Sequence, residues 1–288
     1  WCMIVVVLHV ASLVCRLKKD KAEESKVALN KGKEMEDDIE VSTFNVTGYS
    51  LGGFNAAYVA KLDETRQSFN FENVLLINPP VSIYNSISLL DRMINNIPGG
   101  MDNFDTFFDN LMRAYINVYK ESSDAIGDDF LYKAYKALNL KDEQLAALIG
   151  VSFRLSSASL IFTSDVVVDF GFIKPKGLIL NRYSNLTQYN EVANRIGFTD
   201  YYHEFFYPFY KETETDATRN EFIAAISLKE IEDYLRSTEK ITVMHNADDI
   251  ILQPGEIEFF ADVFGTRATI YPTGGHCGNM SYSDNVAH

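Results

Sequence analysis

Ser50 is flanked by Gly48 and Gly52 in the stretch Gly-Tyr-Ser-Leu-Gly, and a further glycine, Gly53, follows directly. A serine hydroxyl becomes a useful nucleophile only when a neighbouring base takes its proton. Small flanking residues let the chain turn sharply, so that the hydroxyl stands clear of its surroundings. The spacing therefore indicates a candidate nucleophile, and the alternative is an ordinary polar residue in a tight turn.

A nucleophilic serine needs a general base, and the base needs an acid that holds its tautomer. His276 is our candidate base because it lies in the glycine-rich stretch Thr-Gly-Gly-His-Cys-Gly. Asp248 and Asp249 are the candidate acids, since both follow the apolar run Ile-Thr-Val-Met-His. The structural alternatives are a histidine on a surface loop and an ordinary acidic turn.

Three other side chains could do similar chemistry, and we expect none of them to do so. His245 stands inside an apolar strand-like run, and His203 stands inside the aromatic cluster at residues 200–212, so we expect both to be packing residues. Cys277 is next to His276, but nothing near it in the sequence favours a thiolate.

The elements that must position these residues alternate between strand and helix. Residues 43–47 and 73–80 read as strands, and a helical pattern follows Ser50. Strand-like texture returns at residues 240–252 and 267–278, with a helical pattern between them. Such alternation predicts an α/β fold with a mostly parallel sheet and helices on both faces.

Three stretches, "GYSLGG", "HNADDIIL" and "YPTGGHCG", each stand at the end of a predicted strand, in the order serine, acid, histidine. In these pieces, which cover under half of the chain, the sequence resembles the α/β-hydrolase superfamily. The resemblance implies Ser50 as nucleophile, His276 as general base and Asp249 as the acid, with Asp248 as the alternative. It also implies that the backbone N–H of Leu51 stabilises the oxyanion.

The resemblance also implies a domain organisation. Residues 1–80 and 238–288 would form the α/β-hydrolase core, which we expect to be incomplete at both ends, and residues 81–237 would form a mainly helical cap or lid. The superfamily's second oxyanion donor follows an earlier strand that often carries His-Gly, whereas Val10 follows His9 here. The second donor is therefore unassigned.

The expected activity is hydrolysis of a carboxylic ester or thioester through an acyl-Ser50 intermediate, with a hydrophobic acyl group preferred. That preference comes from the Phe, Tyr, Leu and Met residues of the insertion, which would line a pocket or simply pack between helices. Three alternatives use the same scaffold: an acyltransferase, a peptidase and a catalytically inactive binding protein.

The composition and charge of the chain limit the classes of partner that we expect it to bind. Forty acidic and 26 basic residues leave a formal net charge of −14, which argues against nucleic-acid binding and against docking on an anionic membrane by overall charge alone. No motif for a metal site or a phosphate-binding loop occurs, so we expect no cofactor and no metal. The partner implied by the resemblance is a small acyl substrate. The sequence does not indicate an oligomeric state.

The first residues allow two interpretations. Residues 3–10 (MIVVVLHV) are rich in β-branched residues, which favours a buried strand, and the charged residues 17–38 read as a solvated helix or a link. The alternative is a targeting or membrane segment within residues 1–16. The sequence leaves the localisation open between these two interpretations; a cytoplasmic location is preferred, and no clear membrane anchor is expected.

Overall fold

A computed structural model describes residues 43–121, 136, 140–213, 216–280, 282, 283 and 286. The strand expected at residues 3–10 and the helix or link expected at residues 17–38 lie outside the described residues, and so does the candidate targeting segment at residues 1–16.

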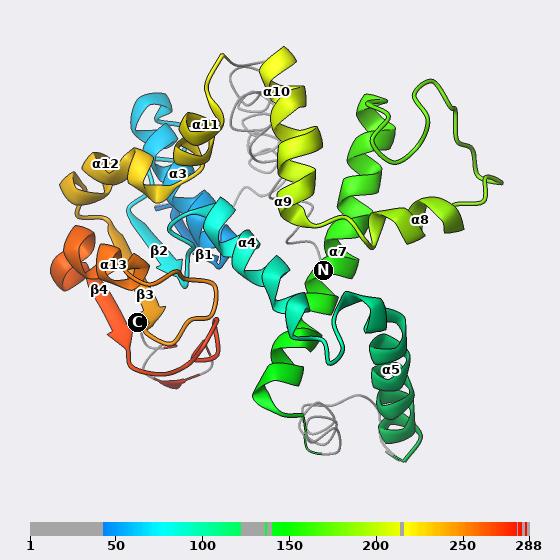
Figure 1. The fold of residues 1–288 in the computed structure, drawn as a ribbon. Helices are drawn as coiled ribbons and strands as arrows, with labels where there is room; N and C mark the ends of the chain where they lie inside the picture. The colour runs from blue at the N-terminus through cyan, green and yellow to red at the C-terminus, as the bar shows by residue number, and fades with distance from the viewer. Residues whose placement is uncertain are drawn as a thin grey trace, which may run out of the picture. The chain divides into compact units, whose positions relative to one another are not determined.

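The described part of the chain contains a four-stranded sheet in which every pairing is parallel. The strands are β1 (Asn45–Tyr49), β2 (Asn73–Ile77), β3 (Ile241–Asn246) and β4 (Ala268–Tyr271), and they lie side by side in sequence order. Helix α3 (Leu51–Arg66) connects β1 to β2, and α13 (Glu256–Phe264) lies between β3 and β4 (Figure 1). The α/β fold class predicted from the sequence is confirmed.

The register of the strands aligns their carboxyl ends. Tyr49 pairs with Ile77, and Ile77 pairs with Met244. On the far side, Asn246 pairs with Tyr271. Since parallel strands all end at the same edge of the sheet, residues that directly follow the strands are brought together there.

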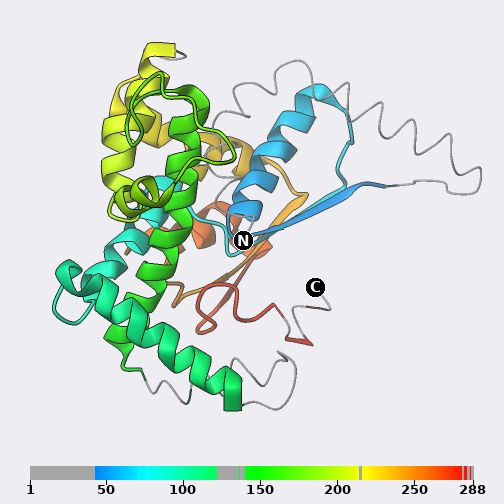
Figure 2. The same cartoon turned by 90° about the vertical axis from the view of Figure 1, so that its right-hand side faces the viewer.

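A hydrophobic core lies against the sheet. In β2, Val74 and Leu76 are fully buried, and they alternate with less buried neighbours as expected for side chains on one face. The core joins the sheet to α3, α12 (Glu232–Ser237) and α13, and Figure 2 shows α3 running alongside the strands that it connects. Its buried members include Phe54, Ala57, Ala60, Leu228, Leu235, Ile241, Val243, Phe260 and Val263.

The chain divides into two compact units. Unit 1 comprises residues 1–89 and 215–288, and unit 2 comprises residues 90–214. The boundary falls within α4 (Ile83–Arg92), and α11 (Arg219–Ala225), the 3₁₀ turn η4 (Leu228–Ile231) and α12 belong to unit 1. Val81 and Leu228 are fully buried in the core of unit 1, so the parts of 81–237 next to the strands pack with the sheet.

Unit 2 is helical in its described residues. Its elements are η1 (Met93–Asn96), η2 (Met101–Asn103), α5 (Phe104–Glu121), α7 (Asp142–Val168), α8 (Thr187–Ala193), α9 (Phe198–Tyr201), the π-helical turn η3 (Tyr202–Phe206) and α10 (Tyr207–Thr213). Helix α7 packs closely on η1, since a Cβ on Gly150 would lie 2.1 Å from the backbone nitrogen of Ile94. Buried Arg154 of α7 forms an ion pair of 2.7 Å with Asp91.

Helix α7 is the one helix of the described residues that is long and apolar enough, by length and composition, to cross a membrane. About half of its most apolar stretch is buried inside the protein, and buried core helices pass the same test. Asp165 near its end is fully buried and accepts hydrogen bonds from four backbone N–H groups, those of residues 171 to 174. These four bonds attach the chain after α7 to the end of the helix.

Candidate active site

Ser50 occupies the turn between β1 and α3, where its backbone adopts φ 53° and ψ −127°. A positive φ is unfavourable for a residue with a side chain, so the surroundings must hold it. The Ser50 N–H donates to the carbonyl of Ile77 over 2.7 Å, which ties the turn to the end of the neighbouring strand β2. The serine is 7% exposed.

Gly48 has to be a glycine because two segments of backbone pass very close to each other before and after Ser50. A Cβ on Gly48 would lie 2.1 Å from the carbonyl oxygen of Gly52, which no real side chain tolerates. A Cβ on Gly53 would lie 3.0 Å from the carbonyl oxygen of Gly48 and 3.2 Å from Pro79. Space for the sharp turn, suggested by the sequence, is thus required at Gly48 and is tight at Gly53, whereas a Cβ on Gly52 would meet nothing within 4 Å.

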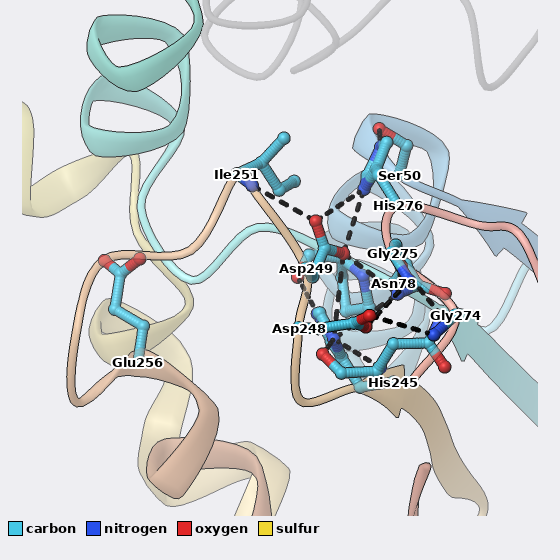
Figure 3. Close-up of polar contacts among 12 residues, drawn as sticks. Ser50, Asn78, His245, Asp248, Asp249, Ile251, Glu256, Gly274, Gly275 and His276 are labelled. Carbon is cyan, nitrogen blue, oxygen red and sulfur yellow. Dashed lines mark hydrogen bonds and ion pairs between the residues drawn. The ribbon is translucent and has the colours of Figure 1, made fainter. Parts of the chain in front are cut away.

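His276 joins the serine to the acid. Its Nε2 lies 2.8 Å from Ser50 Oγ, and its Nδ1 lies 2.9 Å from Asp249 Oδ2 and 3.1 Å from Asp249 Oδ1 (Figure 3). Because a carboxylate only accepts, Nδ1 carries a proton and Nε2 is left free to accept the serine proton. Three residues that the sequence singled out therefore form one hydrogen-bonded series, all within unit 1.

The carboxylate of Asp249 is fully buried and has a donor on every side. Its Oδ2 accepts from the side-chain amide of Asn78 over 2.9 Å, and its Oδ1 accepts from the Ile251 N–H over 3.1 Å. With the bonds from His276, these contacts compensate for the removal of the charge from water. The carboxylate is held in one orientation toward the imidazole.

Asp248, the alternative acid, has a different position. Its oxygens accept the backbone N–H groups of Gly275 over 2.7 Å and of Gly274 over 3.2 Å. Both glycines belong to residues 272–279, which we call the His276 loop. Asp248 thus contacts the backbone of the loop that carries the histidine, whereas Asp249 contacts the ring itself.

Asn78 is a residue of this site that our sequence analysis did not single out. It directly follows β2, is 3% exposed and has a φ of 45°, in the left-handed region that asparagine tolerates better than most residues. Its backbone N–H donates to the carbonyl of Met244, which aims the side-chain amide at Asp249. The sequence analysis placed Asn78 inside a strand at residues 73–80, whereas β2 ends at Ile77; its nearness to the carboxyl end of that strand was the available signal.

Two further asparagines hold the His276 loop against the sheet. Asn246, at the end of β3, donates to the carbonyl of Gly275 over 2.8 Å. Asn279 donates to Asn246 Oδ1 over 2.7 Å and to the carbonyl of Thr273. Gly274 has to be a glycine at this approach, because a Cβ there would lie 2.0 Å from Asn279 Oδ1.

His245 is buried beside the acid, as a packing residue. It is 1% exposed, and its ring lies against Phe260 with centroids 4.6 Å apart. Its Nε2 lies 3.1 Å from the carbonyl of Pro79 and its Nδ1 lies 2.9 Å from the N–H of Asn246, so Nε2 carries the proton. Burial lowers the pKa of His245, against the opposing charge of Asp249, which favours this neutral ring.

The environment of His276 favours its protonated form. Burial lowers the pKa of this histidine, but the hydrogen bond and charge of Asp249, together with contacts from Cys277, outweigh burial and raise the pKa to about 9. The ring must be neutral to accept the Ser50 proton. Proton transfer from the serine therefore becomes more favourable as the pH rises toward that value.

The Leu51 N–H is the first of α3, so it has no acceptor within the helix. The positive end of the helix dipole lies at the same place, next to Ser50 Oγ. Both features suit an oxygen that gains negative charge beside the serine. His9 and Val10, the sequence positions considered for a second donor, lie outside the described residues.

The other singled-out side chains lie elsewhere or have no metal-like arrangement. His203 belongs to η3 in unit 2. Cys277 is partly buried with a free thiol. No group of three or more His, Cys, Asp or Glu residues that could hold a metal ion occurs in the described part of the chain.

Comparisons of the chain with protein-family models, with curated proteins and with solved structures found no match.

The first prediction concerns pH. The rate at which a fluorophosphonate modifies Ser50 should rise from neutral pH with a midpoint of about 9, because only neutral His276 takes the serine proton. Cys277→Ala should move this midpoint to lower pH, since Cys277 helps to raise the pKa of His276. Second-order rate constants measured from pH 6 to 10, each about a pH unit apart, test both points. A rate that is already constant at pH 7 would contradict the prediction.

The second prediction concerns Asn78. Asn78→Ala should lower the same rate constant by about tenfold to a hundredfold, because the buried carboxylate of Asp249 loses one hydrogen bond and its fixed orientation. Asn73→Ala is the matched control at the opposite end of β2, where the side-chain amide donates to Asn45 Oδ1 rather than to the acid. Equal rate constants for the two variants would show that Asn78 does not position the acid.

Proposed function

We propose that the protein is a serine hydrolase that cleaves a carboxylic ester or thioester through an acyl-Ser50 intermediate. The observation that carries the proposal is the hydrogen-bonded series from Ser50 Oγ through His276 to buried Asp249. The strained backbone at Ser50 and its position before the helix N-terminus support it further, since an ordinary turn serine needs neither.

Each residue has a defined part in the proposed reaction. Ser50 Oγ attacks the carbonyl carbon while His276 Nε2 takes the serine proton, and Asp249 stabilises the imidazolium that forms. The Leu51 N–H donates to the oxyanion. His276 then gives its proton to the departing alcohol or thiol, and the acyl group stays on the serine.

Deacylation repeats these steps with water as the nucleophile. His276 takes a proton from the water as it attacks the acyl-Ser50 carbonyl, and the same proton returns to Ser50 Oγ when the acid leaves. An acyltransferase would use an alcohol or amine in place of this water. The two activities differ only in the acceptor, so they are separated by product analysis in the presence of added alcohols.

The proposal includes the fold of the α/β-hydrolase superfamily, with a core formed by residues 1–80 and 238–288 and a helical cap formed by residues 81–237. It is supported by the parallel order β1 to β4 and by the position of serine, acid and histidine after three of these strands. The hydrophobic acyl group is a further part of the proposal. Phe104, Phe107 and Phe108 pack with Ile94 in the core of unit 2, so their presence alone does not define an acyl pocket.

The third prediction tests the nucleophile. A fluorophosphonate probe should label the intact protein once, at Ser50, and Ser50→Ala should abolish the labelling because it removes the hydroxyl that lies 2.8 Å from His276 Nε2. Ser86→Ala, a buried serine of unit 1, is the matched control and should be labelled like the parent protein. Absence of labelling in the parent protein would remove the basis of the proposal. Assays with p-nitrophenyl esters of increasing chain length follow only if the parent protein is labelled.

The fourth prediction assigns the acid. Asp249→Asn should lower kcat on the best p-nitrophenyl ester by about 10³- to 10⁴-fold, because an amide stabilises neither the tautomer nor the imidazolium of His276. Asp248→Asn should lower kcat by about tenfold or less, since Asp248 accepts backbone N–H groups of the His276 loop and not the His276 ring. The reverse order of the two effects would move the acid to Asp248.

A further inference from the structure

A ten-residue loop at residues 177–186 lies between α7 and α8 (Figure 1). It leaves large apolar side chains exposed to solvent. Ile179 is 87% exposed and Tyr183 is 80% exposed, the two highest values for large apolar side chains among the residues that the structure describes. Leu178 and Leu186 are 41% and 38% exposed. Single exposed apolar residues are common on protein surfaces, but four in one short loop are not.

The segment that leads from α7 into this loop is held by hydrogen bonds and an ion pair. The fully buried Asp165 carboxylate accepts four backbone N–H groups of residues 171–174, at 2.8 to 2.9 Å. Asp169 then forms an ion pair with buried Lys174 and accepts the N–H of Gly177 at the start of the loop. These contacts fix the start of the loop relative to the end of α7.

The tip of the loop is a hydrogen-bonded turn. The Asn181 N–H donates to Ser184 Oγ over 2.9 Å, and the Ser184 N–H donates back to the Asn181 carbonyl over 3.0 Å. The Tyr183 N–H donates to Asn181 Oδ1 over 2.9 Å. These bonds keep Tyr183 outside, so its exposure is a property of an ordered turn.

Alternate residues of the loop point to different surroundings. Leu180 packs with the cluster of Ala158, Phe162 and Tyr189 in unit 2. Its neighbour Ile179 points away from the protein, as the exposure shows. The loop therefore uses one apolar residue as an anchor and presents the next to the outside.

The charge of this region differs from that of the whole chain. Residues 170–190 contain three basic residues and no acidic residue, whereas the chain carries −14 overall. Lys174 is buried in its ion pair, which leaves Lys176 and Arg182 exposed beside the apolar tip. The Arg182 guanidinium lies over the Tyr183 ring, 4.6 Å from its centroid.

We propose that the loop at residues 177–186 docks the protein on a lipid bilayer, with Ile179 and Leu178 inserted at the boundary between headgroups and acyl chains. Tyr183 suits the same depth because its ring is apolar and its hydroxyl is polar. Lys176 and Arg182 would meet the lipid phosphates. The remaining acidic charge opposes this weakly, since charges beyond about 8 Å are screened at physiological salt.

A lipid surface fits these observations better than a protein partner does. A protein interface needs a broad patch with a complementary shape, whereas a fluid bilayer accepts a few protruding apolar side chains of any shape. Basic residues beside an apolar tip also match the anionic headgroups of a membrane. The proposal is independent of the reaction at Ser50, and it assigns no position to unit 1.

The fifth prediction is tested by sedimenting the whole protein with vesicles. The protein should bind vesicles of phosphatidylcholine mixed with phosphatidylserine, and Ile179→Asp should lower the partition coefficient by about tenfold or more. Ile116→Asp, at a site 45% exposed on α5, is the matched control and should bind like the parent protein. Ser50→Ala should also bind like the parent, which separates this result from failure of the proposed chemistry.

Two further variants distinguish how the loop binds. The double variant K176Q/R182Q replaces both cations with neutral side chains. It should bind the mixed vesicles more weakly, by about fivefold per charge, and bind pure phosphatidylcholine vesicles like the parent protein. Brominated lipids should quench the fluorescence of the tryptophan introduced by Ile179→Trp. They should not quench the fluorescence of the tryptophan introduced by Ile116→Trp.

Three outcomes would overturn the proposal. They are no sedimentation of the parent protein with either vesicle, equal partition coefficients for Ile179→Asp and the parent, and no quenching of Ile179→Trp. A dimer that Ile179→Asp converts to a monomer, without vesicle binding, would assign the loop to contact between two copies of the chain. Circular dichroism melting curves confirm that each variant is folded.

Discussion

The buried carboxylate of Asp249 is the point on which the site depends, because a charge without exposure to water must be matched by donors from every side. Those donors come from different parts of the sheet: Asn78 follows β2, Ile251 follows β3 and His276 follows β4. Satisfying one side chain therefore requires three strands in the correct register. The same register that builds the sheet also orients the imidazole, so stability and site geometry are two results of one arrangement.

At Ser50, the other end of the hydrogen-bonded series, close packing of the backbone fixes the geometry. The carbonyl oxygen of Gly52 occupies the space where a side chain at Gly48 would lie, and Ser50 between them is held at a positive φ. Such a conformation is retained only when its surroundings fix it, and the bond from the Ser50 N–H to the Ile77 carbonyl does so from the neighbouring strand. Rigid loops rather than long flexible side chains thus set the distance between Ser50 Oγ and His276 Nε2.

The parts of this structure that were predictable from sequence are those that local patterns determine. The change from β-branched residues to a helical pattern at Ser50 identified β1 and α3, and the order of strand ends placed Ser50, His276 and an acidic pair at one edge of the sheet. The resemblance favoured Asp249 over Asp248, but only the coordinates show that the two adjacent carboxylates point to different partners, the His276 ring and the N–H groups of its loop. Asn78 escaped notice because its role depends on a left-handed backbone and on a partner 171 residues away, and neither leaves a local pattern.

The separation of the site residues along the chain has a consequence for synthesis. Ser50 and His276 are 226 residues apart, so at about 5–20 residues per second the serine would leave the ribosome's catalytic centre roughly 10 to 45 seconds before the histidine is added. Strands β1 and β2 with α3 can form in that interval, since their contacts are local. The serine, however, has no partner for its proton until β4 has paired with β3. Under the proposed function, a nascent chain therefore carries an inert hydroxyl until β4 is in place.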